Sequence, residues 1–311
     1  MRKCMKTDKR IQVLLSTYNG EKYLREQLDS FLLLEGVENI KVLIRDDGST
    51  DHTPMILKEY CQRYGFEVVL GENLGVNDSL FWLFNHCDLS CDYYALSDQD
   101  DVWIKEKLVT AVKQLEKFDE SKPAMFSSCS EIVDENLNFR GSTLVPYRGV
   151  SFFNAMVQNV TPGHTQVFNR AMMLKMIENG VSDVHVIDWW LYLVATGIGE
   201  ITFDRNYTVK HRQHGDNAEG YELTFWKQSL KRLKKVRFDK GNSISLQLRA
   251  FYNRYGQVLN EEKKCEVERY FSSQKNLFRR IDYVLTCRAF RQTWLETVIF
   301  KVLYILGKYN I

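Results

Sequence analysis

The sequence predicts an α/β fold, with a mostly parallel sheet flanked by helices and a helical extension at the C-terminus. Two observations lead to this prediction. Over the first 130 residues, short apolar runs alternate with helix-like patterns, as right-handed strand-helix-strand units require. After residue 220 the chain becomes strongly basic, which indicates a second region with other partners. We therefore expect one domain over residues 1–220, with halves of about 1–130 and 131–220, and an extension over 221–311.

Each expected strand is a short apolar run. These runs are IQVLLS (11–16), NIKVLIR (39–45), FEVVL (66–70), YYALS (93–97) and AMFSS (124–128). The segments between them carry apolar residues at helical spacing, near 21–34, 53–64, 76–87 and 105–118. Short buried strands that alternate with helices build a mostly parallel sheet.

Polar clusters follow three of these strands. They read STYNG (16–20), DDGSTD (46–51) and SDQDD (97–101). Ligands of such sheets bind at the carboxyl ends of the strands, so we expect the binding site there. The sequence contains neither G-x-G-x-x-G nor G-x-x-x-x-G-K-[ST], which argues against a dinucleotide fold and against a P-loop. A phosphate ligand must therefore be held in another way.

The third cluster brings the carboxylates of Asp98, Asp100 and Asp101 close together in the chain. Like charges at this spacing repel one another and resist burial, so a cation should lie opposite them. Carboxylate oxygens suit Mg²⁺ or Mn²⁺, and such an ion can bridge Asp98 and Asp100 to a diphosphate. The alternative is a cap for the helix that follows, which explains one carboxylate but not three.

Four motifs resemble, in order, those of the family 2 glycosyltransferases, which are inverting enzymes of the GT-A (Rossmann-like) fold. They read VLLSTYNGEKYLREQLDSFL, VLIRDDGSTDHT, ENLGVNDSL and YYALSDQDDVWIKEKL. The resemblance covers about residues 10–220, and SDQDDVW with the later RQHGDN is most similar to bacterial rhamnosyltransferase-like enzymes. It implies a metal-dependent hexosyltransferase with a dTDP- or UDP-linked sugar donor and Mn²⁺ or Mg²⁺ as cofactor.

The resemblance also implies roles for the nucleotide-binding residues. Ser16 and Tyr18 are expected to line the base and ribose, and Asp98 belongs to the same set. Asp46 is expected to accept the base N3–H, which suits uracil or thymine because their imide presents one N–H between two carbonyls. The alternative for Asp46 is a polar turn, closed by Gly48, that caps the next helix.

By the same resemblance, Asp98 and Asp100 form the D-x-D pair, with Asp100 as the direct metal ligand. In KHRQHGDN, His214 matches a histidine that can complete the metal site, and Arg212 is available to the diphosphate oxygens. A lone histidine is more often structural, so that role for His214 stays open. Asp101 serves either the outer shell of the metal or the cap of the next helix.

Transfer with inversion needs a carboxylate that takes the proton of the acceptor hydroxyl. Asp188 in VIDWWLYLVA matches the family's base position before a helix, and Trp189 and Trp190 can form a wall of the sugar site. The alternative is an N-cap aspartate followed by two core tryptophans. In TPGHTQVFNRAM, Gly163 lets the backbone approach the donor sugar, whereas the role of His164 is open.

The expected function is transfer of a sugar, rhamnose from dTDP-L-rhamnose in our interpretation, onto a polyprenyl-linked saccharide in bacterial cell-surface polysaccharide synthesis. Two alternatives are a non-catalytic glycan- or membrane-binding relative and a sugar nucleotidylyltransferase. The first is disfavoured because Asp46, Asp100 and Asp188 are all intact. The second would need a basic, glycine-rich triphosphate loop near the N-terminus, which the sequence does not contain.

The C-terminal extension has its own charge. Residues 221–311 hold 19 Lys and Arg but 8 Asp and Glu, a net charge of +11, whereas the remainder has −9. FWKQSLKRLKKVRF (225–238) mixes basic with apolar residues like an interfacial helix, and TWLETVIFKVLYIL (293–306) is too short to span a bilayer. A solvated basic helix is the alternative.

These features lead to expectations about location and partners. The N-terminal MRKCMKTDKR is charged rather than apolar, so we expect a cytoplasmic enzyme. The basic tail favours the inner leaflet of the cell membrane, and the C-terminal helices offer a contact for a homo-oligomer. Nucleic acid is not expected as a partner, because the half that carries the site is acidic and RNA-binding motifs are absent.

Overall fold

The computed structural model describes residues 6–178, 180, 184–214 and 243–311. They fall into two compact units. Unit 1 comprises Met1–Val145, Thr161–Val181 and Glu200–Gly220, and unit 2 comprises Pro146–Val160, Ser182–Gly199 and Tyr221–Ile311. The sequence predicts that residues 146–160 and 182–199 belong to the first domain. In the structure both segments group instead with the C-terminal helices, because their own helices pack against each other and onto that bundle.

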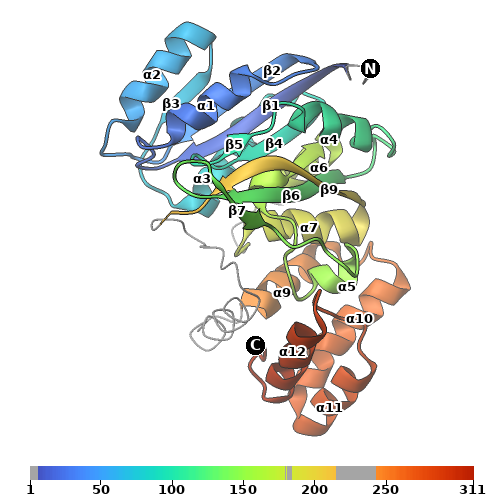
Figure 1. The fold of residues 1–311 in the computed structure, drawn as a ribbon. Coiled ribbons are helices and arrows are strands. Elements are labelled where there is room, and N and C mark those ends of the chain that lie inside the picture. The colour runs from blue at the N-terminus through green and yellow to red at the C-terminus, as the bar shows by residue number, and fades with distance from the viewer. Residues whose placement is uncertain (1–5, 179, 181–183, 215–242) are drawn as a thin grey trace. The chain divides into compact units, whose positions relative to one another are not determined.

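The described part of unit 1 forms a nine-stranded sheet (Figure 1). Its strand order is β3-β2-β1-β4-β8-β6-β9-β5, and β7 pairs with β6. The strands are β1 (Thr7–Thr17), β2 (Val37–Asp46), β3 (Glu67–Leu70), β4 (Tyr93–Ser97), β5 (Val102–Trp103), β6 (Ala124–Val133), β7 (Phe139–Ser142), β8 (Val167–Asn169) and β9 (Glu200–Arg212). The five predicted apolar runs correspond to β1, β2, β3, β4 and β6.

The sheet is parallel where the apolar runs predict it. β1 pairs in parallel with β2 and β4, and β2 does so with β3. The second half is mixed: β6 and β9 are parallel, whereas β8, β5 and β7 join antiparallel. Strands as short as β5 and β8 carry no periodic pattern, so the sequence does not reveal them. The predicted α/β fold is confirmed, with a mixed second half.

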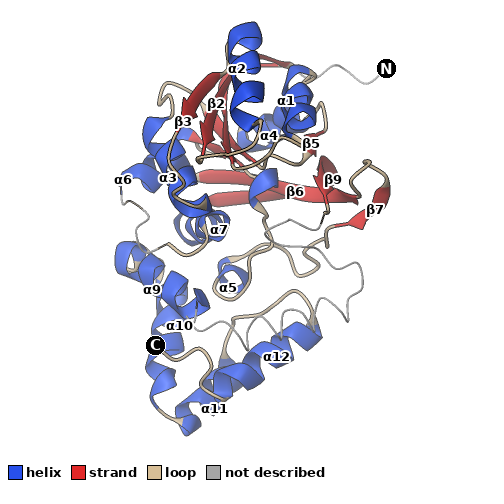
Figure 2. Ribbon diagram, turned by 90° about the vertical axis from the view of Figure 1, so that its left-hand side faces the viewer, coloured by secondary structure: helices blue, strands red, loops and turns tan. Residues whose placement is uncertain are grey.

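Helices cover both faces of this sheet (Figure 2). They are α1 (Leu24–Leu32), α2 (Thr53–Tyr64), α3 (Val76–His86), α4 (Lys107–Leu115) and α6 (Arg170–Glu178), with the 3₁₀ turn η1 at Gly163–Thr165. α1, α2 and α4 share one core with the sheet, and α3 packs with α6. Gly65 ends α2 in the left-handed conformation at φ 71°, where glycine is favoured because it lacks a Cβ.

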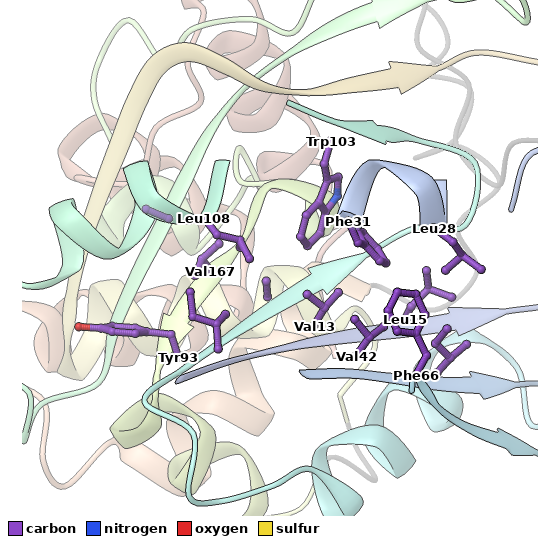
Figure 3. Packing of buried hydrophobic residues seen from close by; sticks show 14 of the residues in the cluster. Val13, Leu15, Leu28, Phe31, Val42, Phe66, Tyr93, Trp103, Leu108 and Val167 are labelled. Atoms are coloured by element: carbon purple, nitrogen blue, oxygen red, sulfur yellow. The ribbon is translucent and has the colours of Figure 1, made fainter. Parts of the chain in front are cut away.

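The core under α1 and α4 uses alternate residues of the strands. Ile11, Val13 and Leu15 of β1 lie in it together, because successive side chains of a strand point to opposite faces. Phe31 of α1 meets Trp103 of β5 edge to face, with ring centroids 4.7 Å apart (Figure 3). This contact fixes α1 against the sheet, and with it the loop that leads from β1 into α1.

Unit 2 is helical in its described part, with a core rich in aromatic residues. Its elements are α5 (Phe152–Ala155), α7 (Ile187–Ile198), α9 (Ser243–Tyr255), α10 (Glu261–Ser272), η2 (Ser273–Lys275), α11 (Leu277–Thr286) and α12 (Trp294–Ile305). No helix among the described residues is long and apolar enough to cross a membrane. The predicted interfacial segment 225–238 lies outside the described residues, whereas 293–306 corresponds to α12.

Candidate active site

The loops after β1, β2 and β4 leave the sheet at one edge. The strand register fixes this arrangement, because Thr17 lies beside Asp46 and Leu15 lies beside Ser97. The carboxyl ends of these parallel strands therefore meet, and the three predicted polar clusters come together there.

Asp46 forms a tight turn with Ser49. One carboxylate oxygen accepts the Ser49 hydroxyl at 2.5 Å, and the other accepts the Ser49 backbone N–H at 3.0 Å. Gly48 between them has φ 81°, a conformation that favours glycine. This geometry is the polar turn foreseen as the alternative for Asp46. Each carboxylate oxygen has two lone pairs, so the base contact stays a prediction beside this structural role.

Asp47, which the sequence did not single out, holds the loop before α3. Its buried carboxylate pairs with Arg45 and accepts the backbone N–H groups of Leu74 and the next residue, both at 2.9 Å. Arg45 in turn donates to the Ser79 hydroxyl at 2.9 Å, and that oxygen lies 2.6 Å from the hydroxyl of Ser16. Ser16, a predicted nucleotide residue, is thus tied to the second loop.

Gln99 joins the acidic loop to the first loop. Its Oε1 accepts from the Thr17 hydroxyl at 2.5 Å and from the Tyr18 N–H at 2.9 Å, and its Nε2 donates to the Tyr18 carbonyl at 3.1 Å. A Cβ at Gly20 would lie 2.6 Å from Gln99 Oε1, so glycine permits this approach. The clamp fixes the backbone of Tyr18, whose residue surface is 46% exposed.

The three carboxylates of the acidic loop lie in three different environments. The Asp98 side chain is 56% exposed, that of Asp100 is mostly buried, and that of Asp101 is fully buried. Asp100 Oδ2 lies 2.9 Å from His214 Nε2, although the two residues are 114 positions apart. The structure therefore brings together two of the three residues predicted as metal ligands, Asp100 and His214.

Asp101 connects this loop to the end of β9. Its Oδ1 accepts from His211 Nδ1 at 2.9 Å and from the Arg212 N–H at 3.2 Å. Its Oδ2 is buried, has no hydrogen-bond partner among the described residues, and lies 3.8 Å from His164 Nδ1. The His164 and His211 rings stack with centroids 4.4 Å apart, and with Asp101 they offer a further group of metal-type ligand atoms.

The pKa values of Asp101 and Asp100 are shifted in opposite directions. Burial alone would raise the pKa of Asp101, but His211 and His164 outweigh it and hold that pKa below its usual value. Burial lowers the pKa of His211, yet Asp101 raises it to about 9 overall. Burial, Asp101 and Asp98 together raise the pKa of Asp100. The neighbouring carboxylates thus favour the neutral form of Asp100, whereas the two histidines favour the charged form of Asp101.

These residues fit the metal that the sequence predicts. Asp98 and Asp100 supply carboxylate oxygens, and His214 supplies an imidazole nitrogen beside Asp100. Such a mixed set suits Mn²⁺, and its carboxylates suit Mg²⁺. Burial and the two neighbouring carboxylates raise the pKa of Asp100, and a bound cation would offset both effects.

The Arg212 side chain is buried and binds groups of the surrounding loops. Its Nε donates to the Asp100 carbonyl at 2.9 Å and its Nη2 to Glu26 at 2.7 Å, and the guanidinium lies 4.4 Å from the centre of the Tyr23 ring. Its Nη1 donates to the carbonyl of Glu135. The predicted contact of Arg212 with diphosphate stays a prediction, because these partners give the guanidinium a structural task already.

The predicted acceptor-side residues lie in unit 2, except Gly163, which opens η1 of unit 1. Asp188 is in the first turn of α7 and accepts the N–H of Trp189 at 2.6 Å, whereas Val186 is the N-cap. Trp189 donates its indole N–H to the Ala155 carbonyl at 2.6 Å, and Trp190 is buried. Both tryptophans have the core positions of the alternative interpretation, and their contact with sugar stays a prediction.

The sequence did not indicate a site role for four polar residues of unit 1 that lie here: Gln99, Lys107, His164 and His211. Lys107 is buried, donates to the His164 carbonyl and lies 3.8 Å from the centre of the Trp103 ring. Burial lowers its pKa to about 7, against the pull of Asp101 and Asp98. The sequence offers one local signal for these four residues: Gln99 is an uncharged polar residue inside the acidic run SDQDD.

Comparison with known proteins bears on this arrangement. The sequence model described as Glycosyl transferase family 2 matches residues 12–177, more than half of the 311 residues. The chain belongs to glycosyl transferase family 2. Its activity is accordingly glycosyl transfer, and its sheet with flanking helices is the GT-A fold that the motifs imply.

This family 2 glycosyltransferase is similar in sequence to a dTDP-rhamnosyl transferase and in structure to TarS. It is 29% identical over 247 residues to the dTDP-rhamnosyl transferase RfbG of Shigella flexneri, covering 72% of this chain and 79% of that protein. S. aureus TarS 1-349 in complex with UDP superposes with a TM-score of 0.59 at 16% identity, and the match covers 96% of this chain and 89% of the TarS 1-349 chain.

The mannosyltransferase PcManGT from Pyrobaculum calidifontis, in complex with GDP-Man and Mn²⁺, superposes with a TM-score of 0.53 at 15% identity. The match covers 97% of this chain and 86% of PcManGT. At such low identities, the two structural matches establish the shared fold and nothing finer.

The clamp formed by Gln99 can be tested by hydrogen exchange. In Gln99→Leu the Tyr18 N–H and carbonyl lose their partners, so we expect the amides of residues 17–20 to exchange about tenfold faster or more, for a loss of ~1.4 kcal/mol of local stability. Gln62→Leu, an exposed glutamine of α2, serves as control. Unchanged exchange in the Gln99 variant would show that the first loop is held without the clamp.

Proposed function

We propose that this family 2 glycosyltransferase transfers rhamnose from dTDP-L-rhamnose, with inversion, onto a lipid-linked saccharide at the cytoplasmic face of the membrane. The observation that carries the proposal is the pairing of Asp100 with His214 at 2.9 Å beside exposed Asp98, at the carboxyl edge of the sheet. The 29% identity to a dTDP-rhamnosyl transferase over most of both chains supports the choice of donor.

We propose that Asp98, Asp100 and His214 hold Mn²⁺ or Mg²⁺. When bound, the ion supplies positive charge to a leaving diphosphate. Asp100 is held for this task from two sides, by His214 at its carboxylate and by Arg212 at its carbonyl. The Mn²⁺ in PcManGT, a protein of the same fold, supports a metal here.

The nucleotide is proposed to lie over the first and second loops. The exposed ring of Tyr18 offers a surface for a base, and Ser16 and Asp46 lie on the two adjacent strands β1 and β2. The clamp by Gln99 fixes the Tyr18 backbone next to the metal-binding loop. A donor whose base lies on the first loop and whose diphosphate meets Asp100 would therefore bridge two rigidly linked segments.

Asp188 is proposed as the base that takes the proton from the acceptor hydroxyl. Its carboxylate lies in the first turn of α7, half-buried, with Oδ1 on the N–H of Trp189. The N-terminal end of a helix stabilises a carboxylate in its charged form, which is the form that accepts a proton. Trp189, Trp190 and Gly163 are proposed to contact the acceptor or donor sugar.

The donor can be identified by thermal shift. A ligand that binds only the folded state adds about 2.7 kcal/mol of stability at 100 times its Kd. With Mn²⁺ or Mg²⁺ present, we expect dTDP-L-rhamnose to raise the melting temperature more than UDP-GlcNAc or GDP-mannose does. A larger shift with GDP-mannose would reject the pyrimidine nucleotide and, with it, rhamnose as the sugar.

The metal site is tested by substitution of Asp100. We expect Asp100→Ala to abolish metal-dependent binding of dTDP, because the ion loses its central carboxylate, while the fold persists. Calorimetric titration with and without Mn²⁺ measures this, and Asp8→Ala, an exposed aspartate of β1, is the control. Equal dTDP affinity in Asp100→Ala and the unaltered protein would remove Asp100 from the metal site.

The base is tested by Asp188→Asn, which keeps the size of the side chain and removes its basicity. We expect donor affinity to persist and turnover to fall by about 100-fold or more, the scale of a lost general base. Glu261→Gln, at an exposed carboxylate of α10 in the same unit, should leave turnover unchanged. An Asp188→Asn variant with full turnover would assign proton removal to another group.

A further inference from the structure

We infer that the outer faces of α11 and α12 in unit 2 bind an anionic phospholipid surface. This inference deepens the proposed function, on whose lipid-linked acceptor it rests, by naming the part of the chain that meets the membrane.

α11 exposes an apolar stripe opposite its packed side. Phe278 and Leu285 are 83% and 76% exposed, and Leu277 and Ile281 are exposed too. At 100° per residue these four side chains lie on the side of the helix away from Tyr283, which is buried. Four exposed apolar residues on a helix of ten residues exceed what scattered surface residues account for.

α12 has the same construction. Its packed side consists of Glu296, Phe300 and Tyr304, which are buried, and Tyr304 lies against Tyr283 with ring centroids 4.9 Å apart. Trp294, 78% exposed, lies with Val302 on the outer side. The two helices lie side by side (Figure 1). They contact each other through Tyr283 and Tyr304 and leave apolar side chains exposed.

The residues around the two stripes are basic. From 273 to 311 the chain carries seven Lys and Arg against two acidic residues, Asp282 and Glu296, and Glu296 is buried. Lys275, Arg279 and Lys308 are exposed. An apolar helix face with aromatic residues and basic neighbours is the composition that lies in a bilayer interface, and each basic residue near an anionic leaflet adds about 1 kcal/mol.

A second copy of the chain fits this face less well. Two copies that met through it would each bring a net charge of +5 from residues 273–311, and like charges across an interface oppose association. Anionic lipid headgroups complement the same charge. The stripes also differ from a spanning segment, since α12 holds 12 residues and a bilayer needs about 20.

The test is sedimentation of the full chain with vesicles, either of pure phosphatidylcholine or with about one third phosphatidylglycerol. We expect binding to the anionic vesicles, weakened but not abolished by high salt, because the apolar contribution resists screening. Phe278→Glu with Leu285→Glu should lower the vesicle partition coefficient at least tenfold. Both side chains are exposed, so the fold should persist.

The matched control is Leu33→Glu with Val258→Glu. It places the same two charges on exposed apolar residues elsewhere, one in each unit, and should sediment like the unaltered protein. Turnover of a water-soluble acceptor separates this inference from the proposed function. We expect the α11 variant to keep that turnover. If neither the unaltered protein nor any variant turned over the acceptor, the proposed function would be rejected instead.

Trp294 gives a direct reading of depth. Brominated lipids in anionic vesicles should quench part of the fluorescence of a Trp226→Phe variant, which removes the tryptophan of unit 2 that lies outside the described residues. Adding Trp294→Phe should remove most of that quenching, because Trp189 and Trp190, the other described tryptophans of unit 2, are buried. Vesicle binding by the α11 variant equal to that of the unaltered protein would overturn the inference. So would a dimer of the unaltered protein that the same two substitutions convert to monomers.

Discussion

The buried carboxylate of Asp101 is the constraint on which the candidate site depends. It joins the loop after β4 to the end of β9 through His211 and the Arg212 N–H. Arg212 then holds the Asp100 carbonyl, and two residues later His214 reaches the Asp100 carboxylate. A buried ion pair is costly to break because it leaves one charge without compensation. Asp100 and His214 therefore lie close together because Asp101 binds His211 and the Arg212 N–H.

A second set of bonds makes the three loops one rigid piece. Gln99 binds the first loop to the acidic loop, and Asp47 binds the second loop to the chain before α3. Each uses a side chain in place of a backbone partner, because loops at the edge of a parallel sheet have unpaired N–H and C=O groups that must be satisfied. A site built in this way is formed before its ligand arrives, which lowers the entropy lost on binding.

The sequence predicts what is encoded locally and misses what depends on distant pairing. The apolar runs predicted β1, β2, β3, β4 and β6, and the family motifs suggested Asp100 and His214 as metal ligands. β5 and β8 are too short for any pattern and exist because β9, β4 and β6 pair with them. Hydrogen bonds to residues 82 and 34 positions away in the sequence hold Gln99 and His164 in place. The tryptophans of DWW are ambiguous in sequence, since a core position and a sugar wall both demand large aromatic residues.

The division of residues between the two units separates two properties of the enzyme. The candidates for metal and nucleotide belong to unit 1, whereas Asp188 and the apolar faces of α11 and α12 belong to unit 2. Unit 1 is built on a sheet whose strand register fixes its loops, so its side chains are positioned by many long-range bonds. Unit 2 is held by helices packed through aromatic rings. Because the two sets of residues belong to different units, we expect affinity for the donor to change independently of the surface proposed to bind lipid.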